Sequence, residues 1–96
     1  MGSYYVYIVS NRHRTVFYTG MTNNLQRRAV EHKSGTGSRF TSQYRVCDLL
    51  YFEEHRQATD AIAREKEIKR WRREKKLALI RTQNPDLVDL AADLNY

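Results

Sequence analysis

The sequence predicts an α/β fold of the α+β type, in which a small, largely antiparallel sheet of three strands is flanked by three to four helices. Three runs rich in β-branched and aromatic residues, at 4–9, 16–19 and 46–53, are typical of strands. Segments with helical spacing of apolar residues follow the second and the third run. A chain of 96 residues suits one domain, which we expect to span 1–96 with its core at about 4–84.

The first two strands are predicted to form a hairpin. Residues 4–9 (YYVYIV) form a continuous apolar run, as expected of a central strand that is covered on both faces. Residues 10–15 (SNRHRT) are polar and typical of a turn, and the second strand ends at Gly20. This order of signals indicates a hairpin with a longer loop.

A helix is predicted at about 25–33, and polar side chains on its inward face are the first sign of a site. Residues 22–24 (TNN) supply N-cap side chains, and Gly35 stands where a helix ends. At about 100° of rotation per residue, one arc holds two apolar and two polar residues, Leu25, Arg28, Ala29 and His32. A buried guanidinium must be paired or must hold a ligand, because an unsatisfied charge costs several kcal/mol.

Residues 34–45 (SGTGSRFTSQYR) are rich in Gly, Ser and Thr, which predicts a mobile loop before the third strand. A second helix should follow at about 59–70. Its inward arc is marked by four apolar residues, Ala58, Ala61, Ile62 and Ile68. Glu65 lies in the middle of this arc, where a carboxylate needs a cation, a metal ion or a raised pKa.

The C-terminal third of the chain predicts two more helices. Trp71 should mark a bend into a helix at 72–82, which Pro85 follows. The tail at 86–94 repeats leucine and alanine at helical spacing, which predicts a C-terminal helix. This helix is either part of the core or a contact for a second chain, and packing within the domain is favoured. We therefore expect a monomer or a weak homodimer.

The net charge of +6 lies in one segment. Residues 64–81 contain nine basic and three acidic residues, whereas the rest of the chain is balanced. Such a run is either a solvated helix face or a surface for a polyanion, most often nucleic acid. No apolar run approaches the ~18 residues that span a bilayer, and Cys47 is a single cysteine, which fits a reducing compartment. We expect a cytoplasmic protein with no membrane partner.

Two tripeptides on the predicted hairpin resemble the motifs of the GIY-YIG nuclease family. Tyr5-Val6-Tyr7 stands where the family has its first tripeptide, and Tyr18-Thr19-Gly20 stands where it has its second. The motif tyrosines Tyr7 and Tyr18 are eleven positions apart, which is within the spacing of the family. Arg28 follows Gly20 by eight residues, as the catalytic arginine of the family does.

The resemblance extends from residue 5 to about residue 90 and is closest to the small, stand-alone, single-domain branch of the family. The segment 61–71 (AIAREKEIKRW) resembles the helix that carries the metal-binding glutamate of the family, which places that role on Glu65. His32, one helical turn after Arg28, is the fifth candidate site residue, beside Tyr7, Tyr18, Arg28 and Glu65. The resemblance implies a GIY-YIG nuclease-like fold and a metal-dependent endonuclease that hydrolyses DNA with a single Mg²⁺ or Mn²⁺ ion.

The resemblance also implies a role for each of these residues. Tyr7 is expected to act as the general base toward water, and Tyr18 to position the phosphate or the water. Arg28 suits a clamp on the scissile phosphate, because its planar fork offers several donors. Glu65 is expected to bind the metal. Excision-repair nucleases have a lysine directly after the second glycine, where it would help to deprotonate a tyrosine. This chain has Met21 at that position, and we expect His32 to take over the role as a cation near the phenolate, beside Arg28 and the metal.

Other interpretations of these residues stay open. Arg28 could simply pair with Glu31, and Glu65 with Lys69, as ordinary ion pairs on a helix surface. Asn84 is a weak match to an asparagine of the family. The co-occurrence of five residues of the needed types at family spacing favours the catalytic interpretation over separate structural roles.

Contacts with nucleic acid are expected from two groups of residues. Basic side chains on the later helices would follow phosphates without reading bases, namely Lys69, Arg70, Arg72, Arg73 and Lys76. Aromatic and basic side chains in the predicted loop would stack on unpaired bases, namely Arg39, Phe40, Tyr44 and Arg45. We therefore expect a preference for single-stranded or distorted DNA, with RNA left open. The competing class is a non-catalytic basic module, or a subunit that needs a partner protein for specificity.

Overall fold

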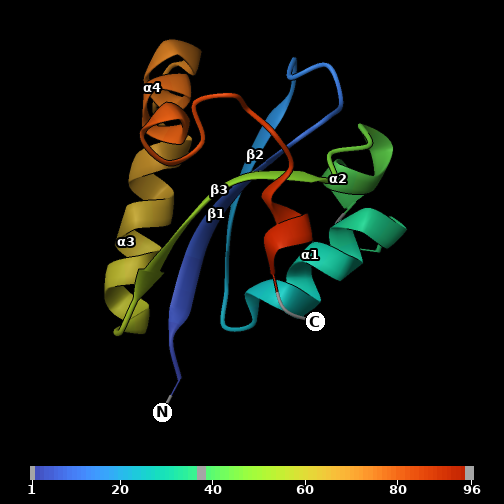
Figure 1. The fold of residues 1–96 in the computed structure, drawn as a ribbon. Helices are drawn as coiled ribbons and strands as arrows, with labels where there is room; N and C mark the ends of the chain where they lie inside the picture. Colours follow the sequence, from blue (N-terminus) through green and yellow to red (C-terminus); the bar gives the residue numbers. More distant parts are fainter. Residues whose placement is uncertain (1, 37–38, 95–96) are drawn as a thin grey trace.

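The computed structural model describes residues 2–36 and 39–94 and shows a three-stranded antiparallel sheet with four α-helices, which confirms the predicted fold class (Figure 1). The strands are β1 (Tyr4–Ser10), β2 (Phe17–Thr22) and β3 (Asp48–His55). Their order in the sheet is β2-β1-β3, so the apolar first run is the central strand. The predicted hairpin is confirmed, because β1 pairs with β2 in antiparallel orientation.

Each face of the sheet is covered by helices. On one face, α3 (Ala58–Lys69) and α4 (Arg73–Gln83) pack with Val6 and Ile8 of β1. On the other face, α1 (Leu25–Ser34) and the 3₁₀ segment η1 (Leu90–Asp93) pack with Tyr7 and Val9 (Figure 1). Burial on both faces explains why β1 is apolar at successive positions rather than at alternate ones.

The helix α1 begins and ends as its sequence predicts. Asn24 is its N-cap, and the side-chain oxygen of Asn24 accepts a hydrogen bond from the backbone N–H of Arg27 at 3.0 Å. Gly35 ends the helix in the left-handed conformation, with φ of 82°. These two caps fix the start and the phase of α1, so they decide which of its side chains face the sheet.

Three local predictions are wrong: the loop at 34–45, the inward placement of Ile62 and the helix at 86–94. The segment 34–45, predicted as a loop, contains a short helix α2 (Arg39–Gln43), while positions 37 and 38 of the loop lie outside the described residues. Ile62 was expected on the inward arc of α3, but its side chain is 40% exposed. The core side of α3 is narrower than the arc drawn from the sequence, with Ala61 and Ile68 as its buried residues.

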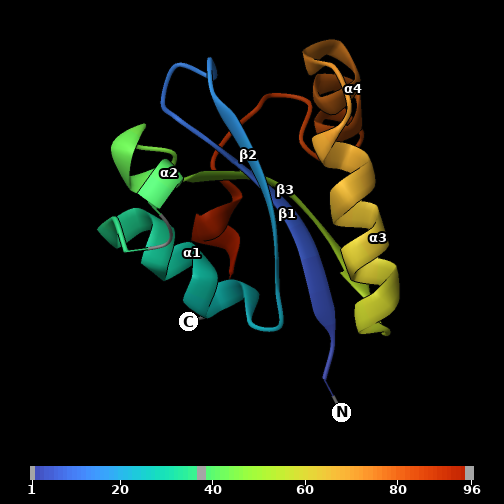
Figure 2. The same ribbon diagram turned by 180° about the vertical axis from the view of Figure 1, so that it is seen from behind.

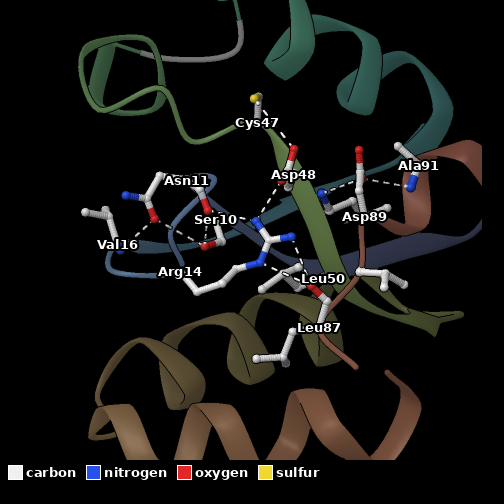
Figure 3. Close-up of polar contacts among 12 residues, drawn as sticks. Ser10, Asn11, Arg14, Val16, Cys47, Asp48, Leu50, Leu87, Asp89 and Ala91 are labelled. Carbon is white, nitrogen blue, oxygen red and sulfur yellow. Dashed lines mark hydrogen bonds and ion pairs between the residues drawn. The ribbon is translucent and has the colours of Figure 1, made fainter. Parts of the chain in front are cut away.

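The tail predicted as a helix at 86–94 instead runs as an irregular segment from α4 past the edge strand β3 to the face covered by α1, and its only regular element is the short η1 (Figure 1). Figure 3 shows its anchor: Arg14 donates from Nη1 to Asp48 at 2.7 Å, and from Nε and Nη2 to the backbone oxygen of Leu87 at 3.2 and 2.9 Å. Asp89 accepts 3.0 Å hydrogen bonds from the backbone N–H groups of Leu49 and Ala91 (Figure 3). These tertiary bonds compete with a regular helix, and helical spacing alone does not reveal them.

In the described part of the chain, no helix combines the length and the apolar character that crossing a membrane requires.

Candidate active site

The candidate site is built around Tyr7, which projects from the centre of β1 toward α1. Its phenol lies over Gly20, its cross-strand partner on β2. A Cβ atom at Gly20 would lie 2.4 Å from the Tyr7 hydroxyl and 2.5 Å from Cζ, distances that real Cβ atoms do not adopt. A glycine inside a strand commonly marks such a close approach. The second motif therefore ends in glycine because any side chain would displace the Tyr7 phenol.

Two side chains from consecutive turns of α1 meet at the Tyr7 hydroxyl. Arg28 Nε donates a hydrogen bond to it at 3.1 Å, and His32 Nε2 lies 3.1 Å from it. The predicted inward placement of His32 is confirmed, since this residue is buried. Arg28 also donates from Nη1 to Glu31 at 3.0 Å. The ordinary helix ion pair therefore exists together with the contact to Tyr7, and neither interpretation excludes the other.

Burial sets the protonation states of this group. Burial, with a further contribution from the charge of Arg28, lowers the pKa of His32 to about 4, so the imidazole is neutral at pH 7. Burial also raises the pKa of Tyr7, although the hydrogen bond from Arg28 opposes this effect. Arg28 has only donors, so its N–H group uses an acceptor position of the phenol oxygen. The O–H of Tyr7 can then donate to Nε2 of the neutral His32.

His32 thus differs in one respect from the sequence-based expectation. A neutral imidazole can accept a proton from Tyr7, but it has no charge with which to stabilise a phenolate. Its Nδ1 atom is buried and has no hydrogen-bond partner within residues 2–36 and 39–94. Two cations lie beside the motif tyrosines: the Arg28 guanidinium contacts Tyr7, and the Lys69 ammonium lies over the ring of Tyr18.

Tyr18 connects this group to the surface through a series of aromatic rings. Its ring centroid lies 6.2 Å from that of His32 and 5.7 Å from that of Phe40, on which it stacks. Phe40 in turn lies 4.8 Å from Tyr44. Phe40 and Tyr44 are 41% and 46% exposed. We call the rings of Tyr18, Phe40 and Tyr44 the aromatic ladder; it leads from the candidate site to solvent over α2.

Glu65 approaches the same place from the opposite layer of the fold. Figure 2 shows β2, an edge strand, between α1 and α2 on one side and α3 on the other. Glu65 on α3 is 21% exposed, and its Oε2 lies 3.5 Å from Lys69 Nζ. Lys69 Nζ also lies 5.9 Å from the centre of the Tyr18 ring. After burial and the Tyr18 phenol, the Glu65 carboxylate contributes to the raised pKa of Tyr7, so it lies within electrostatic reach of the cluster.

The donor set at this place fits a hard divalent ion that keeps most of its water. Glu65 offers one carboxylate, and no group of three or more His, Cys, Asp or Glu side chains that could hold a metal occurs among the described residues. Mg²⁺ is commonly bound through one or two carboxylates together with waters and substrate phosphates. Glu65 alone therefore suits Mg²⁺ or Mn²⁺, whereas a structural zinc site would need four ligands.

Other predicted site residues lie elsewhere or have other contacts. Asn84 donates to the backbone oxygens of Leu50 and Val88 at 3.0 and 2.7 Å and accepts from Val88 N–H, so its amide holds the end of α4 against β3. Arg73 donates to the backbone of the β1–β2 loop and covers the Phe17 ring at 4.7 Å. The remaining predicted nucleic-acid contacts that are exposed are Arg39, Arg45, Lys69, Arg70 and Arg72, while Lys76 is half-buried.

The sequence does not reveal two features of the site. Gly20 is predicted as the end of the second strand and of the second motif, but its contact with Tyr7 is not, although a glycine inside a strand commonly marks a close approach. The ion pair of Lys69 with Glu65 is anticipated from their spacing of four residues, but the position of Lys69 beside the Tyr18 ring depends on the tertiary fold.

Gly20→Ala should destabilise the protein because the added Cβ overlaps the Tyr7 hydroxyl, which must then leave Arg28 and His32. Overpacking of this kind costs about 1–3 kcal/mol, and we expect that decrease in the free energy of unfolding in urea. Gly2→Ala is the matched control, since a Cβ at Gly2 meets nothing within 4 Å. Equal stability of both variants would contradict the close approach of Tyr7 to Gly20.

His32 should make the stability of the protein depend on pH. Its pKa is about 4 when folded and 6.5 when unfolded, so between these values the unfolded chain binds the extra proton. The free energy of unfolding should therefore fall by about 3 kcal/mol as the pH drops from about 6.5 to about 4, and His32→Gln should lack this component. A His32 ring resonance that titrates near pH 6.5 by NMR would contradict the assignment.

Comparisons with known proteins give this geometry a family. A family model described as the GIY-YIG catalytic domain matches residues 3–78. A UPF0213 protein of Staphylococcus saprophyticus is 36% identical over 80 residues, which cover 83% of this chain and 96% of that protein. A UPF0213 protein of Staphylococcus haemolyticus is 38% identical over 80 residues, which again cover 83% of this chain and 96% of that protein.

A solved structure agrees with this assignment. The solution NMR structure of a UPF0213 protein from Bacillus halodurans is similar with a TM-score of 0.57 and 28% sequence identity, and the match covers 88% of each chain. The chain is therefore similar to small UPF0213 proteins and belongs to the GIY-YIG family.

Proposed function

We propose that this protein is a metal-dependent endonuclease that hydrolyses phosphodiester bonds in DNA and favours single-stranded or distorted substrates. The observation that carries the proposal is the Tyr7 hydroxyl, held between Arg28 Nε and His32 Nε2 at 3.1 Å each. A phenol with a cation on one side and a neutral base on the other is arranged to transfer a proton. Membership in a family with a catalytic domain supports a nuclease-like activity.

In the proposed reaction, Tyr7 and His32 act together as the general base. An attacking water gives its proton to the Tyr7 oxygen while the phenol gives its own proton to His32 Nε2, which becomes an imidazolium. The water oxygen then bonds to phosphorus and the bond from phosphorus to the 3′ oxygen breaks. The 3′ oxygen leaves with the electron pair of that bond and takes a proton from solvent. Only a neutral His32 can accept this proton, and burial, which lowers its pKa, keeps it neutral at pH 7. The same burial disfavours the imidazolium, so this charge forms only transiently and the proton then leaves to solvent.

Arg28 and Glu65 would stabilise the charge that develops during this step. Arg28 reaches the Tyr7 oxygen through Nε and has further donors in its planar fork, which suit a phosphate. Glu65 would hold the metal, and a bound Mg²⁺ or Mn²⁺ ion supplies positive charge for the departing oxygen. Tyr18 would position the phosphate or the water beside Tyr7.

The preference for unpaired strands is supported by the aromatic ladder. Large exposed aromatic rings are expensive to leave in water, and Phe40 and Tyr44 are both more than one-third exposed next to the candidate site. Unpaired bases stack on such rings, whereas bases in an intact duplex already stack on each other. Arg39 is the first residue of α2, and Arg45 follows the helix. Both are exposed and can contact the adjoining phosphates.

A binding module without turnover, acting alone or with a partner protein, is the second candidate. It is favoured by one observation: both key charges already have protein partners, since Arg28 pairs with Glu31 at 3.0 Å and Glu65 with Lys69 at 3.5 Å. The aromatic ladder and the basic side chains of α3 and α4 would serve RNA or DNA binding without cleavage. A monomer or a weak homodimer suits either function.

Cleavage assays separate the two candidates. Purified protein should cut single-stranded DNA in Mg²⁺ or Mn²⁺ but not in EDTA, and Glu65→Gln or Arg28→Ala should lower the rate at least about a hundredfold. Glu67→Gln is the matched control, because Glu67 lies two positions along α3 with its side chain 56% exposed. Binding without cleavage under every metal condition, with RNA and DNA substrates alike, would favour the binding module.

Variants of the aromatic ladder test the substrate preference. Phe40→Ala and Tyr44→Ala should each weaken binding of a single-stranded oligonucleotide by about tenfold, since one stacked base is worth about 1–3 kcal/mol. Binding to a linear duplex of the same sequence should change little. Val30→Ala is the control, as another exposed apolar side chain at 50% exposure. Equal cutting of duplex and single strand by the wild-type protein would contradict the preference.

A further inference from the structure

A hollow of about 400 Å³ opens beside Arg28, at the end of the candidate site opposite to the aromatic ladder. Its size lies near the lower end of the range for small-molecule binding sites. The residues that line it come from β1, from the end of β2 and from the start of α1, and they are Tyr4, Met21, Thr22, Asn23, Arg27 and Arg28. Arg28 is thus shared between this hollow and the contact with Tyr7.

The position of the hollow follows from the course of β2. This edge strand starts next to α2, where Tyr18 stacks on Phe40, and passes Gly20 under the Tyr7 phenol. It then ends at Thr22, at the hollow. Met21 is three positions after Tyr18 on the strand, a rise of about 10 Å. The buried Tyr7 hydroxyl lies over Gly20 of β2, between the aromatic ladder at the start of this edge strand and the hollow at its end.

The lining of the hollow combines flat apolar surface with polar groups. Tyr4 is half-buried and lies beyond the paired part of β2, because the pairing of β1 with β2 begins at Tyr5 opposite Thr22. Met21 adds a polarisable thioether, which packs well against aromatic rings. Tyr4 and Met21 are both half-buried against the hydrophobic cluster on the α3 face, so the exposed part of each side chain borders the hollow. Asn23 is exposed and carries an amide that can both donate and accept hydrogen bonds.

The charge of the hollow is positive. The Arg27 side chain is 64% exposed, and its contact with Glu31 is long, at 3.9 Å. Arg28 contributes a second guanidinium, and no acidic residue lines the hollow. An aromatic and a thioether surface beside an amide and two guanidinium groups match the parts of a nucleotide: a base with flat faces and polar edges, and a phosphate.

We propose that this hollow is a second nucleotide subsite, which takes one base and its phosphate from an unpaired strand. This proposal rests on the proposed function and deepens it, because it places the two nucleotides around the scissile phosphate. One neighbouring base stacks on Phe40 and Tyr44, the scissile phosphate lies at Arg28, and the base on the other side enters the hollow. The strand then runs along β2, and its bases must be unpaired on both sides of the cut.

Photochemical crosslinking in EDTA, where no cleavage occurs, tests the two subsites. A series of short single-stranded oligonucleotides carries one 5-iodouracil base at each successive position from the 5′ end to the 3′ end, and the labelled peptides are identified by mass spectrometry. Positions toward one end should label Tyr4 or Met21, and positions toward the other end should label Phe40 or Tyr44. Labels at Phe40 or Tyr44 without any at Tyr4 or Met21 would overturn the subsite and leave the proposed function intact.

Binding measurements on the same oligonucleotides supply a second readout. Arg27→Ala should weaken binding of a strand that spans both subsites by about tenfold, which corresponds to about 1.4 kcal/mol. Arg12→Ala is the control, because it removes the same charge from an exposed position on the β1–β2 loop. Equal losses in the two variants would overturn the proposal as a general effect of charge. Labels at both subsites together with no cleavage in Mg²⁺ would support the subsite while refuting the nuclease.

Discussion

The contact on which the rest of the structure depends is the meeting of Arg28 and His32 at the Tyr7 hydroxyl. It requires a tyrosine in the middle of the most buried strand, a glycine opposite it, and a helix whose phase points two polar side chains at the sheet. The caps Asn24 and Gly35 set that phase. Without the phenol as a partner, burying a guanidinium and an imidazole on the core side of α1 would destabilise the fold.

The charged side chains of the site, Arg28 and Glu65, have protein partners but can still bind a ligand. Arg28 is shared between Tyr7 and Glu31, and Glu65 is paired with Lys69, so the fold carries these groups without a ligand. Each pair is partly exposed on the open side of β2, where solvent and a phosphate can compete with the protein partner. His32 differs from these ion pairs, because it is buried and neutral at pH 7. Its proposed role as a proton acceptor for Tyr7 requires the neutral form.

Residue types and spacing predicted the elements that depend on local sequence. The strands follow from their apolar runs, and α1 follows from its caps and its inward arc, including Arg28 and His32. The helix α2, the exposed side of Ile62 and the irregular tail depend on tertiary contacts, such as the stacking of Phe40 on Tyr18 and the bonds from Arg14 to Leu87. The protonation state of His32 depends on how deeply the fold buries its ring. The helical arc shows that His32 faces inward, but it does not give the extent of burial.

Glu65 on one layer and the Tyr7 cluster on the other are proposed to form one site. Anomalous X-ray scattering from crystals grown with Mn²⁺ is a direct test, because the metal position is then measured without reference to activity. We expect a Mn²⁺ peak at the Glu65 carboxylate, on the side facing Tyr7 and Arg28, with Lys69 displaced. A Mn²⁺ ion bound elsewhere, with Glu65 still paired to Lys69, would contradict it.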